Sequence, residues 1–208
     1  MENLMNGIKR TYAFFAGILM AAICAFEISE ISRYISMISG GNSAYTGELV
    51  IKSIFVLSLI AAGILFILGK AGKGAATLLT VAGGVSLYKT FAYIIGILGN
   101  EMIFGIVYGN IIDMLEIVFF IAPAAVILLS KEKITKKNVL VSLIIELAAF
   151  AISLSGNIAS FAGWGKTIAD ISLFFDVYGL DMLRALICLA AFSLSILSLA
   201  PDKRKKHR

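Results

Sequence analysis

The sequence contains little charge and few chain-breaking residues. Only 15% of its 208 residues are charged and only 2 are proline, whereas 60% are hydrophobic. A soluble domain is nearer one quarter charged, and a chain of this size cannot bury so much apolar surface in its own core. The scarcity of charge therefore excludes a water-soluble fold and indicates an integral membrane protein.

Residues that commonly carry catalysis or bind metals are also scarce. The single histidine, His207, lies in the basic C-terminal segment, and the two cysteines, Cys24 and Cys188, lie far apart within apolar runs. These residues supply no zinc site and no histidine base, no CxxC motif is present, and no glycine-rich loop follows a strand. We therefore expect no enzymatic activity, no cofactor and no metal, and we interpret both cysteines as small buried residues.

Long apolar runs are what the sequence contains instead. Six of them approach the length of about 20 residues that a helix needs to cross a bilayer. They cover residues 12–28, 49–68, 75–98, 112–129, 139–155 and 183–200. Because the runs are continuous rather than alternating with polar residues, they predict helices and not barrel strands. The sequence thus predicts an all-α integral membrane protein of about six transmembrane helices in a single domain, residues 1–208.

The distribution of Lys and Arg predicts the orientation of these helices. Of the 18 basic residues, 13 lie in the N-terminal segment, near Lys70, near Lys133 and in the tail, residues 201–208, and this pattern alternates along the chain. Such a bias places both termini in the cytoplasm. We expect a multi-pass plasma-membrane protein, in a bacterial inner membrane because the loops are short. The basic tail is expected to bind anionic lipid headgroups, and nucleic acid is not expected.

The beginning of the chain allows two interpretations. Lys9-Arg10, an apolar stretch and the small residues up to Ala25 resemble a signal peptide. Glu27, Glu30 and Arg33 then continue on a helical pattern with apolar residues between them. This continuity favours a long, uncleaved first helix.

The helices fall into three similar hairpins in series. The three odd-numbered helices each run to an outer Gly-Asn pair, at Gly41-Asn42, Gly99-Asn100 and Gly156-Asn157, which is typical of a helix C-terminus. An internal repeat would explain the similarity, and so would the features that membrane hairpins generally share. In the third outer segment, residues 157–179, apolar residues at helical spacing around Trp164 predict an amphipathic surface helix, with a lid as the alternative.

Ionisable residues inside the spans are the main candidates for function, because they are costly in lipid. Six of them lie 15 to 19 residues from the inner basic anchor of their helix, which places them in one layer about 22–28 Å from it. They are Glu27, Lys52, Lys89, Asp113, Glu116 and Arg184. One interpretation is that they pair between helices or reach the outer headgroups; the other is that some line a polar pocket open to the outside.

Glu146 is predicted to lie deeper than this layer. It follows Lys137 by nine residues, so it lies about 13 Å into the membrane, among apolar neighbours. No basic residue is predicted at its depth, and an unpaired carboxylate there favours its protonated form. Glu146 is therefore a candidate proton- or cation-binding residue. The alternative is a neutral acid that hydrogen-bonds a neighbouring helix or faces a partner protein.

Small residues indicate where helices approach one another closely or bend. Ala21, Ala25 and Gly63 would permit close contact between helices. Gly83-Gly84 in the middle of the third helix could be a hinge, a close contact or a break at a binding site.

In size and topology the chain resembles the substrate-binding components of energy-coupling-factor vitamin importers. Those proteins also have about six helices, both ends inside, an outward pocket and small residues on the first helix, which Ala21 and Ala25 would supply here. The resemblance implies a transporter, or the substrate-binding membrane subunit of one, for a small polar solute or cation. The alternative is an accessory or assembly subunit of a larger membrane complex, with Glu146 facing a partner helix.

Overall fold

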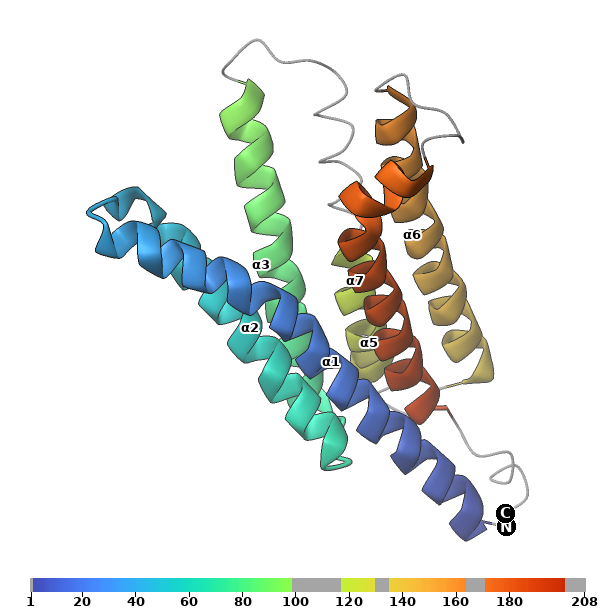
Figure 1. Ribbon diagram of the computed structural model, residues 1–208. Coiled ribbons are helices and arrows are strands. Elements are labelled where there is room, and N and C mark those ends of the chain that lie inside the picture. The colour runs from blue at the N-terminus through green and yellow to red at the C-terminus, as the bar shows by residue number, and fades with distance from the viewer. Residues whose placement is uncertain (1, 99–116, 130–134, 164–170, 201–208) are drawn as a thin grey trace.

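The protein is helical throughout the part that the structure describes. The computed structural model describes residues 2–98, 117–129, 135–163 and 171–200, and these contain helices and turns but no strand (Figure 1). The helices are α1 (Glu2–Ser39), α2 (Thr46–Ile67), α3 (Lys73–Leu98), α5 (Ile117–Leu129), α6 (Lys136–Gly163) and α7 (Ile171–Ser198), with a short 3-10 helix, η1 (Ser43–Tyr45), before α2. The predicted all-helical class is confirmed for these residues.

Among the described residues, four helical segments are long and apolar enough to cross a membrane. They are Asn6–Ser39, Ser43–Ile67, Lys136–Ile158 and Ile171–Ser198. Each is at least as long as the minimum that a bilayer core requires, and their apolar composition supports a membrane location. Helix α1, with 38 residues, is about 57 Å long and exceeds the thickness of the bilayer core even when tilted.

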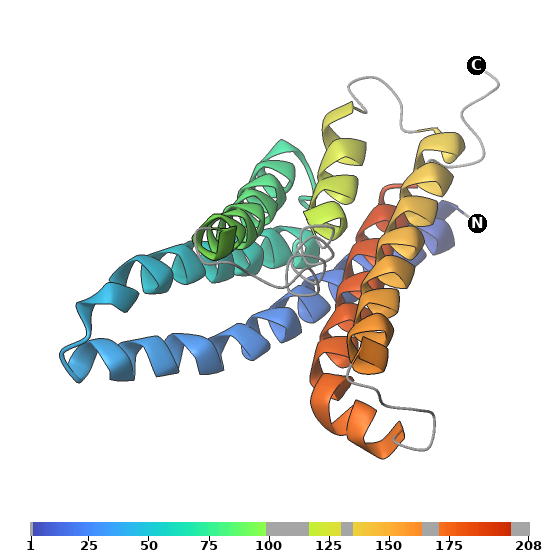
Figure 2. The same cartoon turned by 90° about the horizontal axis from the view of Figure 1, so that it is seen from above.

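Successive helices run in opposite directions, so that the beginning of α1 and the end of α7 lie at the same end of the molecule (Figure 1). Helix α1 packs against both α2 and α7, α3 packs between α2 and α5, and α6 packs against α5 and α7. Their inward faces form one main core that includes Met20, Leu59, Leu79, Phe120 and Phe192. Seen from above, the far end of the α1–α2 hairpin extends away from the other helices (Figure 2).

The two turns at the ends of α2 have glycine at the position where a left-handed backbone is needed. Gly41 has φ 93°, and the Asn42 amide donates to the Met37 carbonyl at 3.1 Å. Gly69 has φ 68°, and the Lys70 amide donates to the Leu65 carbonyl at 2.8 Å. Both turns thus satisfy helix carbonyls through the C-terminal cap that glycine favours, which confirms the predicted Gly41-Asn42 cap.

The third predicted cap and the predicted surface helix are wrong. Helix α6 continues through Gly156 and Asn157 to Gly163, and α7 already begins at Ile171, so the expected separate helix is divided between them. Aromatic packing explains the extension, because the Phe161 ring on α6 lies 5.2 Å from the Phe174 ring on α7, in an edge-to-face arrangement. Gly99-Asn100 and Trp164 lie outside the described residues.

Helices α1 and α2 approach each other closely at two glycines, Gly17 and Gly63, and not at the predicted alanines. A Cβ atom on Gly17 of α1 would lie 2.4 Å from the backbone oxygen of Gly63 on α2. Gly63 was among the predicted contact residues, but Ala21 and Ala25 are exposed. They lie about 100° around the helix from Met20 and Cys24, which are buried.

Helix α3 is continuous across the two glycines in its middle. It runs from Lys73 to Leu98 without the break that was one reading of Gly83-Gly84. A Cβ atom on Gly83 would lie 3.0 Å from Cβ of Phe120 on α5, whereas one on Gly84 would meet open space. Gly83 therefore corresponds to the close-contact alternative.

Candidate functional site

Three of the six residues predicted to form the outer charged layer meet in one cluster around the buried Glu27. Glu27 of α1 is 3% exposed and forms ion pairs with Lys52 of α2 and Arg184 of α7. The Arg184 Nη2 atom lies 2.9 Å from Glu27 Oε1, and Lys52 also pairs with Glu30, which lies one turn beyond Glu27. These four residues are called the outer ion-pair cluster below.

The outer ion-pair cluster joins three helices. The Gly17–Gly63 contact holds α1 close to α2, so that Lys52 reaches Glu27 and Glu30 on the facing side of α1. Two carboxylates and two bases balance in charge, as burial of ions requires. The arrangement therefore acts as an interhelical staple, which is the pairing alternative for these three layer residues.

Glu30 belongs to this cluster although it was not among the predicted site residues. Its side chain is 48% exposed, so its pairing with Lys52 is more solvated than that of Glu27. The sequence indicates that Glu30 shares a helix face with Glu27, because Glu30 follows Glu27 by three positions and residues three apart lie on one face of a helix.

The other layer candidates are not placed in this cluster. Lys89 belongs to the described backbone of α3, but its side chain is outside the described part of the structure. Asp113 and Glu116 lie outside the described residues. The pocket alternative for these three residues stays a prediction.

Glu146 lies on the buried face of α6. Helix α6 begins after Thr135, whose Oγ1 accepts from the Asn138 amide at 3.2 Å, a helix N-cap. From this start the buried positions recur at helical spacing, as Val139, Ser142, Glu146, Ala149 and Ser153. Large apolar side chains on the other face, such as Ile144 and Leu147, are exposed. The Glu146 side chain therefore points toward the helices that pack on α6 and away from the surface that lipid would cover.

Two packed regions enclose Glu146 along α6. On the N-terminal side of Glu146, Val139 packs with Ala122 of α5 and Ile196 of α7. On the C-terminal side of Glu146, Ala149 belongs to the main core, which also includes Cys188 and Phe192 of α7. The Glu146 side chain is 0% exposed, and neither carboxylate oxygen has a hydrogen-bond partner among the described residues.

The helices that face Glu146 supply no nearby counter-charge among the described residues. Helix α5, Ile117–Leu129, contains no charged residue, and the single base of α7, Arg184, pairs with Glu27. On α6 itself the bases are Lys136 and Lys137, about 14 Å away along the helix axis. Glu146 thus has no base close to it on α5, α6 or α7 among the described residues.

Comparison with protein-family models, with curated proteins and with solved structures finds no match to this chain.

Side chains that could bind a metal or react are few in the described ranges. They contain no group of three or more His, Cys, Asp or Glu side chains that could hold a metal ion. Cys24 and Cys188 are both buried and are not joined by a disulfide, which confirms that they are small core residues. The Cys24 thiol lies 3.7 Å from the Val56 carbonyl oxygen of α2, where it acts as a weak donor.

Proposed function

We propose that the protein is a transporter, or the substrate-binding membrane subunit of one, for a small polar solute or cation, and that Glu146 is its ion-binding carboxylate. In this proposal both termini lie in the cytoplasm of a bacterial cell. The observation that carries the proposal is the complete burial of the Glu146 carboxyl group without a partner among the described residues.

The energetics of burial support a role for Glu146 in ion binding. An unpaired carboxylate in an apolar interior costs several kcal/mol, and ionisable groups within membrane spans commonly mark ion pathways. A bound proton or cation would remove this cost. Binding and release of the ion would then change the net charge at Glu146, on the face of α6 that packs against α5 and α7. Such a change would couple ion binding to movement of these helices.

The outer ion-pair cluster has a structural part in this proposal. Because the carboxylates of Glu27 and Glu30 balance the charges of Lys52 and Arg184, these ion pairs keep α1 and α2 together with α7. Lys89, Asp113 and Glu116 are proposed as the residues with which a polar substrate would interact on the outer side.

A thermal-unfolding assay of the purified protein in detergent tests the proposal. The midpoint is measured against a panel of cations, pH values and small metabolites, since a ligand that binds the folded state raises it. We expect at least one ion or solute to raise the midpoint in the wild type and not in Glu146→Gln. Asp181→Asn is the matched control, because Asp181 is an exposed carboxylate on α7 and its neutralisation should leave the response intact.

A second candidate is an accessory subunit of a larger membrane complex. The observation that favours it is the far end of the α1–α2 hairpin, which extends away from the other helices (Figure 2) and has exposed apolar residues such as Ile35 and Val50. Purification under mild conditions distinguishes the two functions. Absence of any ligand response, together with co-purification of other membrane subunits, would reject transport and support this alternative.

A further inference from the structure

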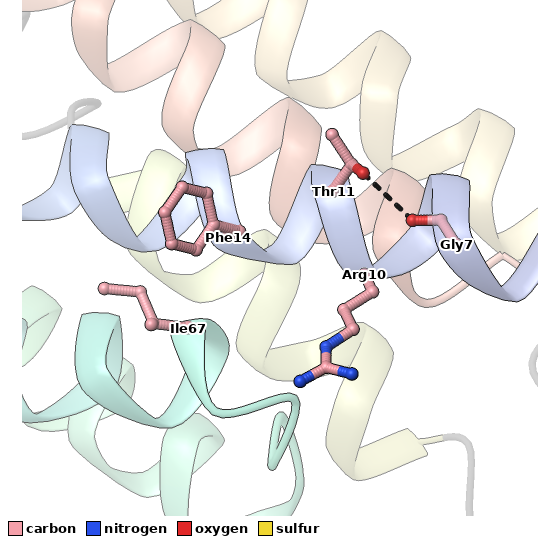
Figure 3. A pocket seen from close by; sticks show the side chains of 5 residues that line it. All are labelled: Gly7, Arg10, Thr11, Phe14 and Ile67. Atoms are coloured by element: carbon pink, nitrogen blue, oxygen red, sulfur yellow. Dashed lines mark hydrogen bonds between the residues drawn. The ribbon is translucent and has the colours of Figure 1, made fainter.

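A groove lies between α1 and the end of α2, at the opposite end of the hairpin from the outer ion-pair cluster. It has a volume of about 370 Å³ and is lined by Gly7, Arg10, Thr11, Phe14 and Ile67 (Figure 3). The four residues of α1 occupy positions i, i+3, i+4 and i+7, so they form one continuous face of that helix. Ile67 of α2 forms the other wall.

The shape of the groove follows from the lengths of the two helices and from one glycine. Helix α2 ends at Ile67, whereas α1 continues to Glu2 and therefore extends past it. Gly7 has no side chain, and a Cβ atom there would have nothing within 4 Å. The Thr11 hydroxyl donates to the Gly7 carbonyl at 3.0 Å, which holds it against its own helix (Figure 3).

The stretches of α1 and α2 that flank the groove contain basic residues but no acidic residues. Arg10 is exposed and forms no ion pair among the described residues. No acidic residue occurs from Asn6 to Phe26 of α1, or from residue 49 to residue 100, a range that includes Lys70 and Lys73. An anion is therefore the complementary ligand.

The groove combines this charge with an apolar wall. The Arg10 guanidinium group lies at the groove together with the Phe14 ring and the Ile67 side chain (Figure 3). A guanidinium group binds phosphate through paired hydrogen bonds, and aromatic and aliphatic side chains bind hydrocarbon. Arg10 lines the same groove as Ile67, the last residue of the apolar α2 span. A bilayer that covers this span would place headgroups next to acyl chains at this end of α2, so that both parts of a lipid would meet the groove.

We propose that this groove is a binding site for one anionic phospholipid. Its phosphate group binds the Arg10 guanidinium group, and the first part of an acyl chain lies against Phe14 and Ile67. The site is separate from Glu146 and does not depend on the transport proposal. It also differs from general attraction of headgroups to the basic tail, because it requires a groove with a defined shape.

Native mass spectrometry of the purified full-length protein tests the site. The protein is equilibrated in detergent with equal amounts of phosphatidylglycerol and phosphatidylcholine, and the retained lipid is counted. We expect one phosphatidylglycerol to be preferred, and Arg10→Gln to weaken its retention about fivefold, the effect of one basic residue near the lipid surface. Lys137→Gln, which removes an exposed base at the start of α6, is the matched control and should retain the lipid.

A second variant tests the shape of the groove without changing its charge. Gly7→Leu places a side chain in the open space of the groove, and it should not impair folding because leucine favours a helix more than glycine does. We expect this variant to lose the bound phosphatidylglycerol although the positive charge of Arg10 is unchanged. Equal retention in Arg10→Gln and Lys137→Gln, or full retention in Gly7→Leu, would overturn the proposal. Displacement of the lipid by millimolar inorganic phosphate would also overturn it, because the apolar wall would then contribute nothing.

Discussion

Glu27 and Glu146 are both carboxylates inside apolar helices, and both are buried, with exposed fractions of 3% and 0%. Glu27 pairs with a lysine of α2 and an arginine of α7. Glu146 has no hydrogen-bond partner among the described residues. Burial alone therefore does not distinguish a structural carboxylate from a candidate ion-binding carboxylate. A neighbouring counter-charge distinguishes them, because a counter-charge stabilises the ionised form of the carboxylate.

The largest effect is expected for Lys52→Met, which removes one counter-charge from Glu27. Breaking a buried ion pair leaves an uncompensated charge, so the free energy of unfolding should fall by about 3 kcal/mol. Denaturation in mixed micelles measures this change. The double variant Glu27→Gln with Lys52→Met should recover part of the loss; a loss below about 1 kcal/mol for Lys52→Met would mean that the cluster is no more than a surface pair.

The next largest effect is expected for Gly17→Ala, which tests whether close helix contact makes the pairing of Glu27 possible. The added Cβ would lie 2.4 Å from the Gly63 oxygen, so α1 and α2 must separate, at a cost of about 2 kcal/mol. Gly47→Ala is the control, because a Cβ there has nothing within 4 Å. Equal unfolding midpoints for the two variants would show that the glycine contact is not required.

A smaller effect is expected for Arg184→Gln. Its side chain is 29% exposed, so water screens its pairing with Glu27, and the expected loss of stability is about 1 kcal/mol. Arg184→Lys, which keeps the charge without the forked geometry, should lose less. If Arg184→Gln destabilises the protein as much as Lys52→Met, α7 contributes to the staple equally with α2.

The smallest effect on stability is expected for Glu146→Gln. Glutamine keeps the shape of the side chain and removes an ionisable group that has no partner among the described residues, so the free energy of unfolding should stay within about 1 kcal/mol of the wild type or rise. The same denaturation assay, with Glu27→Gln as the comparison, checks this. If both variants are destabilised equally, the contrast between the two carboxylates is lost.

The sequence predicted the helices better than their ends. Each described α-helix contains all or part of a predicted apolar run, because a helix in lipid must satisfy its own backbone. The prediction of a helix end at Gly156-Asn157 was wrong, because α6 continues through these residues. A Gly-Asn pair that ends one helix can lie inside another when residues beyond it, such as Phe161, pack against a neighbouring helix, here at Phe174 of α7. The sequence-based prediction also selected Ala21 and Ala25 in place of Gly17, because spacing alone does not indicate which face of α1 meets α2.

For the candidate site, the sequence by itself determined how far each ionisable residue lies along its helix from the nearest basic anchor, since this distance follows from the rise per residue. It thereby identified Glu146 as isolated from bases along its own helix. Only the tertiary structure decided which helices are neighbours, and hence that Lys52 and Arg184 pair with Glu27 while α5 and α7 bring no free base to Glu146 among the described residues. The physical reason is that ion pairing depends on distances of a few ångströms between separate helices, and these distances depend on how the helices pack.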